Sequence, residues 1–240
     1  MVHLVLIRHG QSEWNSQNKF TGWVDVDLSD QGKKEAKTAA KLIINENLIF
    51  DYYFSSFQKR AINTLKLIQE NTGIENIKFE EAWQLNERHY GALTGLNKEE
   101  MKKKLGEKKI HEFRRSWNLK PENLDKNNKY HPLNIEKYKN IPKENIPDSE
   151  SLEDTYNRVI PYFESKILKL LKLKKKILIA AHGNSIRALC KYLFKINNED
   201  ISNLEIPTGN PLVIDFDNSL KVIKARYLDL ERAKKLLFTN

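Results

Sequence analysis

The chain alternates short apolar runs with longer amphipathic stretches. Two of the apolar runs, residues 4–7 and 175–181, have the continuous hydrophobicity of buried strands. Shorter runs bounded by polar residues predict further strands at 51–56, 77–81, 213–216 and 222–226, the last two as a hairpin. Apolar positions at helical spacing predict helices at 30–45, 58–70, 96–106, 110–117, 151–173, 185–194 and 229–237. Pro161 should kink the long helix that contains it.

This order of strands and helices favours one three-layer α/β domain over residues 1–240, with helices on both faces of a mostly parallel sheet. The segment 118–147 interrupts the periodicity, because it is rich in Asn, Lys and Pro. Long segments of this kind in compact enzymes often cover a pocket, so it is a candidate lid. The alternative is a mobile surface segment.

The balance of charge brings nucleic acid into consideration. Lys and Arg number 41 against 32 Asp and Glu, which gives a formal charge of +9. Much of the excess lies in lysine runs on predicted helices, without a nucleic-acid-binding motif, so we interpret it as solvated surface. The same positive field attracts small polyanionic metabolites. We therefore expect small-molecule partners and no nucleic acid.

Membrane-spanning potential, cysteine content and histidine spacing limit where the protein acts and what it binds. No stretch is long and apolar enough to span a bilayer and no leader precedes the first strand, so we expect a cytoplasmic protein with no membrane partner. The single cysteine, Cys190, lies in an apolar helical pattern and is interpreted as a core residue. The histidines do not fall at zinc spacing, so we predict no metal site. The sequence leaves open whether the chain forms a homodimer.

The candidate chemistry follows the two apolar runs. The first ends in Arg8, His9 and Gly10, and the second ends in His182 and Gly183. A neutral imidazole is a nucleophile, a guanidinium offers a planar fork to phosphate oxygens, and glycine admits a close backbone approach. One Arg-His-Gly fits a structural histidine at a strand end equally well. Two such strand ends, if adjacent in a parallel sheet, bring two imidazoles together and favour phosphoryl transfer through a phosphohistidine.

Phosphoryl transfer between hydroxyls also needs a proton acceptor and a cradle for anions. Glu87, within LNERHYG, is the candidate general acid and base, and His89 beside it is interpreted as structural. Arg60 lies at a predicted helix start, where backbone N–H groups favour an anion.

Seven stretches of the sequence, in order, resemble one enzyme family: LIRHGQSEWN, FTGWVDVDLSDQG, QKRAINT, LNERHYGALTGLNK, FRRSW, HGNSIRALCKYL and IPTGNPLV. They resemble the 2,3-bisphosphoglycerate-dependent phosphoglycerate mutases of the histidine phosphatase superfamily, over residues 4 to about 227. Arg-His-Gly is shared by the wider superfamily, whereas FTGWVDVDLS and LNERHYGALTGLNK are similar to the mutases in particular.

The resemblance implies the activity and the roles. It implies interconversion of 3-phosphoglycerate and 2-phosphoglycerate in glycolysis and gluconeogenesis, primed by 2,3-bisphosphoglycerate, without a metal. The catalytic residues it implies are His9, Glu87, His182, Arg8 and Arg60. The substrate-binding residues it implies are Arg8, Asn15, Thr21, Gly22, Arg60, Glu87, Tyr90, Lys98, Arg114, Arg115, Gly183 and Asn184. The alternatives are a phosphatase of the same superfamily, which differs in admitting water, and a basic nucleic-acid-binding module.

Overall fold

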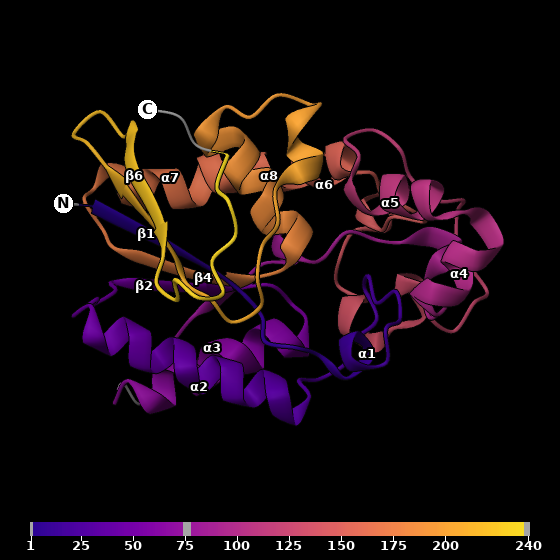
Figure 1. The fold of residues 1–240 in the computed structure, drawn as a ribbon, viewed down its shortest axis with the longest axis horizontal. Helices are drawn as coiled ribbons and strands as arrows, with labels where there is room; N and C mark the ends of the chain where they lie inside the picture. Colours follow the sequence, from indigo (N-terminus) through magenta and orange to yellow (C-terminus); the bar gives the residue numbers. More distant parts are fainter. Residues whose placement is uncertain (1, 74–77, 238–240) are drawn as a thin grey trace.

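A computed structural model describes residues 2–73 and 78–237 and arranges them around a mixed sheet (Figure 1). The sheet has six strands in the order β3-β2-β4-β1-β5-β6. The strands are β1 (Val2–Arg8), β2 (Tyr52–Ser55), β3 (Glu80–Glu81), β4 (Ile177–Ala181), β5 (Leu212–Phe216) and β6 (Val222–Tyr227). The four strands from β3 to β1 pair in parallel, and β5 and β6 form the predicted antiparallel hairpin. The mostly parallel α/β sheet is thus confirmed.

The register of the two central strands sets up the site. In the parallel pair of β1 and β4, Arg8 lies opposite Ala181. The next backbone N–H, that of His9, donates to the Ala181 carbonyl at 2.9 Å. His9 and His182 therefore leave the sheet side by side at its carboxyl edge, as the sequence predicts.

Helices cover both faces of this sheet (Figure 1). Alternate residues of β1 enter opposite cores: Leu4 and Leu6 pack on one face, Val5 and Ile7 on the other. The first core also contains apolar residues of α6 (Leu152–Tyr162), α7 (Leu168–Lys172) and α8 (Gly183–Phe194). The second core also contains those of α2 (Asp30–Asn45) and α3 (Lys59–Asn71). The three-layer architecture is confirmed.

Short helices gather beyond the carboxyl ends of β1 and β4, on the right of Figure 1. They are α1 (Glu13–Ser16), α4 (Lys98–Leu105) and α5 (Glu107–Arg115). Asn97 caps α4 by accepting the N–H groups of Glu99 and Glu100. Gly106, at φ 87°, turns the chain sharply between α4 and α5 in a conformation that disfavours other residues.

The segment 118–147 contains only short 3₁₀ turns, at Pro132–Asn134, Glu136–Tyr138 and Lys143–Asn145. It is nevertheless packed, since Tyr138, Ile141 and Ile146 form an apolar cluster with Trp23. The Tyr138 hydroxyl donates to the Trp23 carbonyl at 2.7 Å. The segment therefore supports the loop that contains Gly22, and its action as a lid stays a prediction.

Three predicted elements differ from the structure. The helix expected at 151–173 divides, because a π-helical segment, Phe163–Ile167, follows the turn that holds Pro161. The strand expected at 77–81 is reduced to β3, and its first residue lies outside the described ranges. Residues 229–237 form no helix, so that prediction is wrong. None of the helices in the described ranges is long and apolar enough to cross a membrane.

Competing hydrogen bonds explain the missing last helix. The Asp229 carboxylate accepts from the backbone N–H and from Nε of Arg232, and the Asp229 N–H donates to the Asn210 side chain. The Arg232 guanidinium also donates to the carbonyl of Thr208. These contacts hold the tail as a turn against the loop that follows α8, and Leu230 stays 79% exposed instead of entering a core.

Candidate active site

The two histidines meet at the carboxyl edge of the sheet. Their ring centroids lie 4.9 Å apart with the planes at 59°, and both side chains are buried. In the described residues, His9 is contacted at both ring nitrogens and His182 at Nε2 alone, and these contacts define what each ring can do.

His9 has the form of a nucleophile. Its Nδ1 lies 2.6 Å from the Gly10 carbonyl, an acceptor only, so Nδ1 carries the proton and Nε2 keeps its lone pair. Arg60 Nε donates to Nε2 at 3.3 Å. Burial, then the positive charges of Arg60 and Arg8, hold the pKa of His9 well below its usual value. The ring is therefore neutral at pH 7, as nucleophilic attack requires.

His182 has the form of a donor. Its Nε2 lies 2.7 Å from the Ser56 hydroxyl, which also accepts the Gln58 N–H at 3.1 Å. Burial, followed by Arg60, lowers the pKa of His182 well below its usual value, so this ring is also neutral. Its Nδ1 is buried and has no hydrogen-bond partner among the described residues. In the tautomer in which Ser56 donates to Nε2, the proton lies on Nδ1, and an anion would satisfy it.

Two arginines flank the histidines and are held differently. Arg60 is 1% exposed, and its guanidinium donates to the carbonyls of Val24 and Gly22 at 3.0 and 2.9 Å. Arg8 donates to the Ile206 carbonyl at 2.8 Å, and its buried Nε has no partner in the described part of the chain. Arg60 is thus fixed by the protein, whereas Arg8 keeps a donor for a ligand.

Glu87 is oriented by three N–H groups. Its Oε1 accepts from the Arg88 backbone at 2.8 Å, and from the side chain and backbone of Asn184 at 2.8 and 3.3 Å. Within the described ranges, all hydrogen bonds to this carboxylate end on Oε1. The other oxygen is left for a proton on a ligand. His89, interpreted from sequence as structural, lies buried and accepts the Gly91 N–H at 3.0 Å.

Two adjoining cavities open beside these groups. They share Arg8, Glu87, Tyr90 and Arg114; the first also reaches His9, and the second reaches Asn184. Their linings in the described residues hold seven cationic side chains and one carboxylate, that of Glu87. The cations are Arg8, Lys19, Arg60, Lys98, Arg114, Arg115 and Arg187. A cavity with this excess of positive charge suits a ligand with more than one anionic group.

The structure brings together the residues expected from sequence. All of them line one of the two cavities except His182, which contacts His9. The first cavity is lined by His9, Asn15, Thr21, Gly22, Arg60 and Lys98, and the second by Arg115, Gly183 and Asn184. Both are lined by Arg8, Glu87, Tyr90 and Arg114.

Sequence reasoning missed Lys19 and Arg187. Arg187 donates to the Asn184 side chain at 2.7 Å from one helical turn further along α8. That three-residue spacing was the signal that could have identified it. No comparable signal marked Lys19, which follows a turn and resembles other surface lysines.

Two further side chains have shifted pKa values near neutrality. Burial lowers the pKa of Lys98 to about 8, with Tyr90 opposing and Arg114 adding to the effect. Burial is the largest single influence and would raise the pKa of Tyr90, but the contributions of Arg88 and Arg114 together lower the value to about 8. The cavity therefore contains groups that titrate just above physiological pH.

Comparisons with known proteins identify the family and the fold of the chain. The model of the histidine phosphatase superfamily (branch 1) matches residues 4–129 and 122–228. A mycobacterial glucosyl-3-phosphoglycerate phosphatase, solved in complex with VO3, superposes with a TM-score of 0.70 at 20% identity, over 95% of this chain and 97% of that one. The chain belongs to the histidine phosphatase superfamily.

More similar relatives place it within that superfamily. The 2,3-bisphosphoglycerate-dependent phosphoglycerate mutase of Pelagibacter ubique is 62% identical over 99% of both chains. The enzyme of that name from Buchnera aphidicola is 54% identical, over 94% of this chain and 98% of the relative. The family indicated by the sequence motifs, the 2,3-bisphosphoglycerate-dependent phosphoglycerate mutases, is thereby confirmed.

Proposed function

We propose that the protein interconverts 3-phosphoglycerate and 2-phosphoglycerate through a phosphohistidine at His9. The observation that carries the proposal is the pair of buried, neutral imidazoles beside a strongly cationic cavity: His9 has its proton fixed on Nδ1, and His182 has an Nδ1 without a partner in the described residues. The names of the relatives supply the substrates. The products and substrates carry a phosphate and a carboxylate, which suits two adjoining basic cavities.

The phosphoryl group is transferred to and from His9 Nε2. Because Nδ1 donates to Gly10, only Nε2 can form the bond to phosphorus. The Arg60 Nε contact to His9 Nε2 opens as that nitrogen bonds to phosphorus. Arg60 then joins Arg8 and His182 in offsetting charge on the transferring group in the transition state. A buried site also excludes water, which would otherwise hydrolyse the phosphohistidine.

Glu87 moves the proton. The hydroxyl of the bound phosphoglycerate loses its proton to the carboxylate as it attacks phosphorus, and a leaving oxygen recovers the proton in the reverse step. Asn184 and the Arg88 N–H hold Oε1, so the proton passes through the other oxygen. Arg114, Arg115 and Lys98 bind the anionic group remote from His9.

The residues fit 2,3-bisphosphoglycerate as the primer. Its two phosphates suit the two adjoining basic cavities. A phosphate there would accept hydrogen bonds from the unpaired nitrogens of Arg8 and His182. When bound, it supplies the phosphoryl group that His9 carries. We infer a cytoplasmic location from the glycolytic substrates. Formation of a homodimer and closure of the site by residues 118–147 stay predictions.

The test is an assay with 3-phosphoglycerate and catalytic 2,3-bisphosphoglycerate, in which 2-phosphoglycerate and free phosphate are followed together. We expect 2-phosphoglycerate as the main product, its loss in His9→Ala, and full activity in the control His111→Ala, whose side chain is exposed. Mainly free phosphate would favour a phosphatase.

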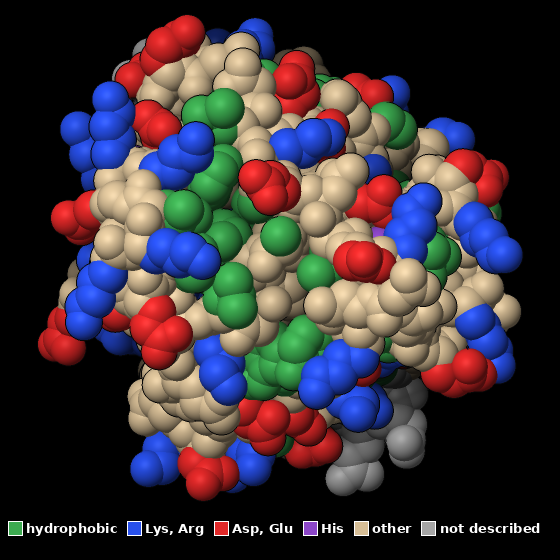
Figure 2. Space-filling model, turned by 90° about the vertical axis from the view of Figure 1, so that its right-hand side faces the viewer, with side chains coloured by type: hydrophobic (Ala, Val, Ile, Leu, Met, Phe, Trp, Pro, Cys, Tyr) green, Lys and Arg blue, Asp and Glu red, His purple; other side chains and the backbone are tan. Residues whose placement is uncertain are grey.

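On the face shown in Figure 2, Lys and Arg are interspersed with Asp and Glu, which gives no support to a nucleic-acid-binding module.

A further inference from the structure

Arg158 of α6 lines neither cavity, yet its guanidinium makes five hydrogen bonds beneath the active site. Two of them form a bidentate pair with the Glu150 carboxylate, at 2.6 and 2.9 Å. The other three end on backbone carbonyls of one loop: Gln84 at 2.7 Å, Asn86 at 3.1 Å and Glu87 at 3.0 Å. The guanidinium therefore reaches the main chain of the acid and base candidate itself.

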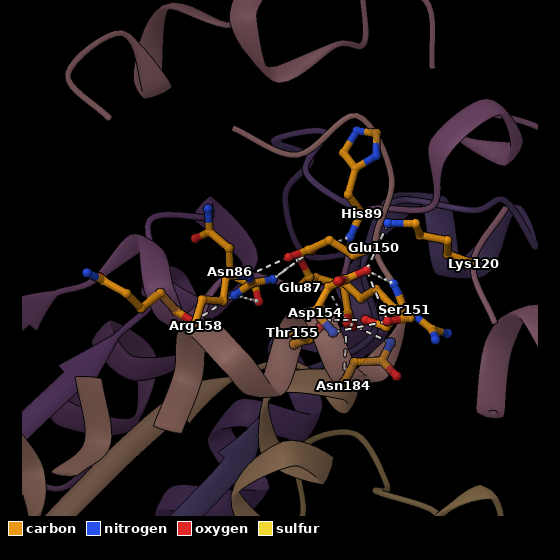
Figure 3. A network of polar contacts seen from close by, with 12 residues as sticks. Asn86, Glu87, His89, Lys120, Glu150, Ser151, Asp154, Thr155, Arg158 and Asn184 are labelled. Atoms are coloured by element: carbon orange, nitrogen blue, oxygen red, sulfur yellow. Dashed lines mark hydrogen bonds and ion pairs between the residues drawn. The ribbon is translucent and has the colours of Figure 1, made fainter. Parts of the chain in front are cut away.

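Glu150 holds the same loop from its other end. Its Oε2 accepts the His89 N–H at 2.8 Å, and its own N–H donates to the His89 carbonyl at 3.0 Å. Figure 3 shows the two charged residues close to Glu87 and His89, with Asn184 near the Glu87 side chain. The ion pair thus holds the loop on both sides of Glu87, since Arg158 contacts residues 84–87 and Glu150 contacts His89.

The loop depends on this pair because it has no regular structure of its own. Residues 86–90 lie between two 3₁₀ turns, Trp83–Leu85 and Gly91–Leu93, outside any helix or strand. Buried carbonyls need hydrogen-bond partners, and the Arg158 fork provides them where a helix or sheet would. The side chain of Trp23 lies 5.5 Å from the guanidinium carbon and packs against it.

We propose that Arg158, with Glu150 as its counter-ion, is a positioning residue for Glu87. It acts through the backbone and touches no substrate. The proposal rests on the assignment of Glu87 as general acid and base. Proton transfer is sensitive to position, since a displacement of about 1 Å can cost roughly 100-fold in rate. Lysine cannot replace Arg158, because an ammonium group has three donors and cannot make the five hydrogen bonds of the planar guanidinium.

The main variant is Arg158→Lys, which keeps the charge and loses the fork. We expect kcat of the mutase reaction to fall roughly 30- to 100-fold, in the range that misplacement of a catalytic group produces. Inhibition by vanadate should change less than about threefold, because Arg8, His9 and His182 are untouched. Glu150→Gln, which keeps the shape of the side chain, should lower kcat in the same way. The control is Lys166→Ala, which removes an exposed ion pair with Glu80 and should leave kcat unchanged.

A double-mutant comparison separates positioning from general support of the fold. In a Glu87→Gln background, adding Arg158→Lys should reduce kcat by less than about twofold, since its effect passes through a carboxylate that is already gone. Losses that multiply in the double variant, or equal losses of kcat and vanadate affinity in Arg158→Lys, would overturn the proposal. A wild-type protein without mutase activity would instead contradict the proposed function, and an active Glu87→Gln would contradict the role of Glu87.

Discussion

Lys98 is the group whose titration we expect to limit activity at alkaline pH. It lines the cavity that reaches His9, and burial lowers its pKa to about 8, whereas an exposed lysine titrates above 10. A lowered lysine pKa means that the side chain is charged below pH 8 and neutral above it. The free enzyme should therefore lose one positive charge from the substrate cavity as the pH rises through 8.

The size of the effect follows from the charge lost. About 90% of Lys98 is protonated at pH 7 and about 10% at pH 9 for a pKa of about 8. A hydrogen bond to a charged group contributes about 1.5–3 kcal/mol, equivalent to about 10- to 150-fold in kcat/KM. We therefore expect kcat/KM for 3-phosphoglycerate to fall about tenfold per pH unit above 8 toward that lower level. Ionisation of Tyr90, whose pKa is also about 8, adds a negative charge and acts in the same direction.

The assay is a profile of kcat/KM between pH 6.5 and 9.5 for the wild-type protein, Lys98→Gln and Tyr90→Phe. In Lys98→Gln, kcat/KM should be low at every pH. It should also decline less above pH 8, because only the ionisation of Tyr90 remains. The control is Lys103→Gln on the same helix, an exposed position that should keep the wild-type profile. An alkaline decline that is unchanged in Lys98→Gln would refute the assignment.

Three other variants or treatments test separate parts of the site. Ser56→Ala removes the hydrogen bond to His182 Nε2, so kcat should fall about 5- to 10-fold, equivalent to about 1–1.4 kcal/mol; an unchanged kcat would contradict that role. Gly10→Ala places a Cβ 2.2 Å from the Gly32 carbonyl oxygen, so the free energy of unfolding should fall by about 3 kcal/mol or more in chemical denaturation; unchanged stability would show that the contact relaxes. Arg8, Arg60 and His182 are placed to offset the charge on the phosphoryl group, the role that a metal ion has in other phosphoryl-transfer enzymes, so EDTA should leave turnover unchanged, and a large loss would reveal a metal site.

The parts of the fold that the sequence predicts are those set by local pattern. The continuous apolar run of β4 and the helical spacing in α2 are strong periodic signals, and they locate the sheet and its layers. The proximity of His9 and His182 follows once the two strands are neighbours, because adjacent parallel strands end at the same edge of the sheet. The sequence left the adjacency of these two strands conditional, and the structure supplies it by pairing β1 with β4.

The parts that the sequence does not predict depend on distant contacts. Arg158 lies in an amphipathic helix, and its partners are up to 74 residues away, so no spacing marks its role. The tail beyond Tyr227 has helical composition, but Asp229 and Arg232 bond to the loop at Thr208 and Asn210 instead. Such polar contacts between distant segments override a weak local propensity.

The central claim is that His9 forms a bond to phosphorus through Nε2. The most direct measurement is to incubate the protein with phosphorus-labelled 2,3-bisphosphoglycerate and to identify the modified atom by ³¹P NMR and peptide mapping. We expect one acid-labile, base-stable label on His9, at Nε2, which is absent from His9→Ala and retained in His111→Ala. A label on His182, a label at Nδ1 of His9, or no label at all would contradict the account.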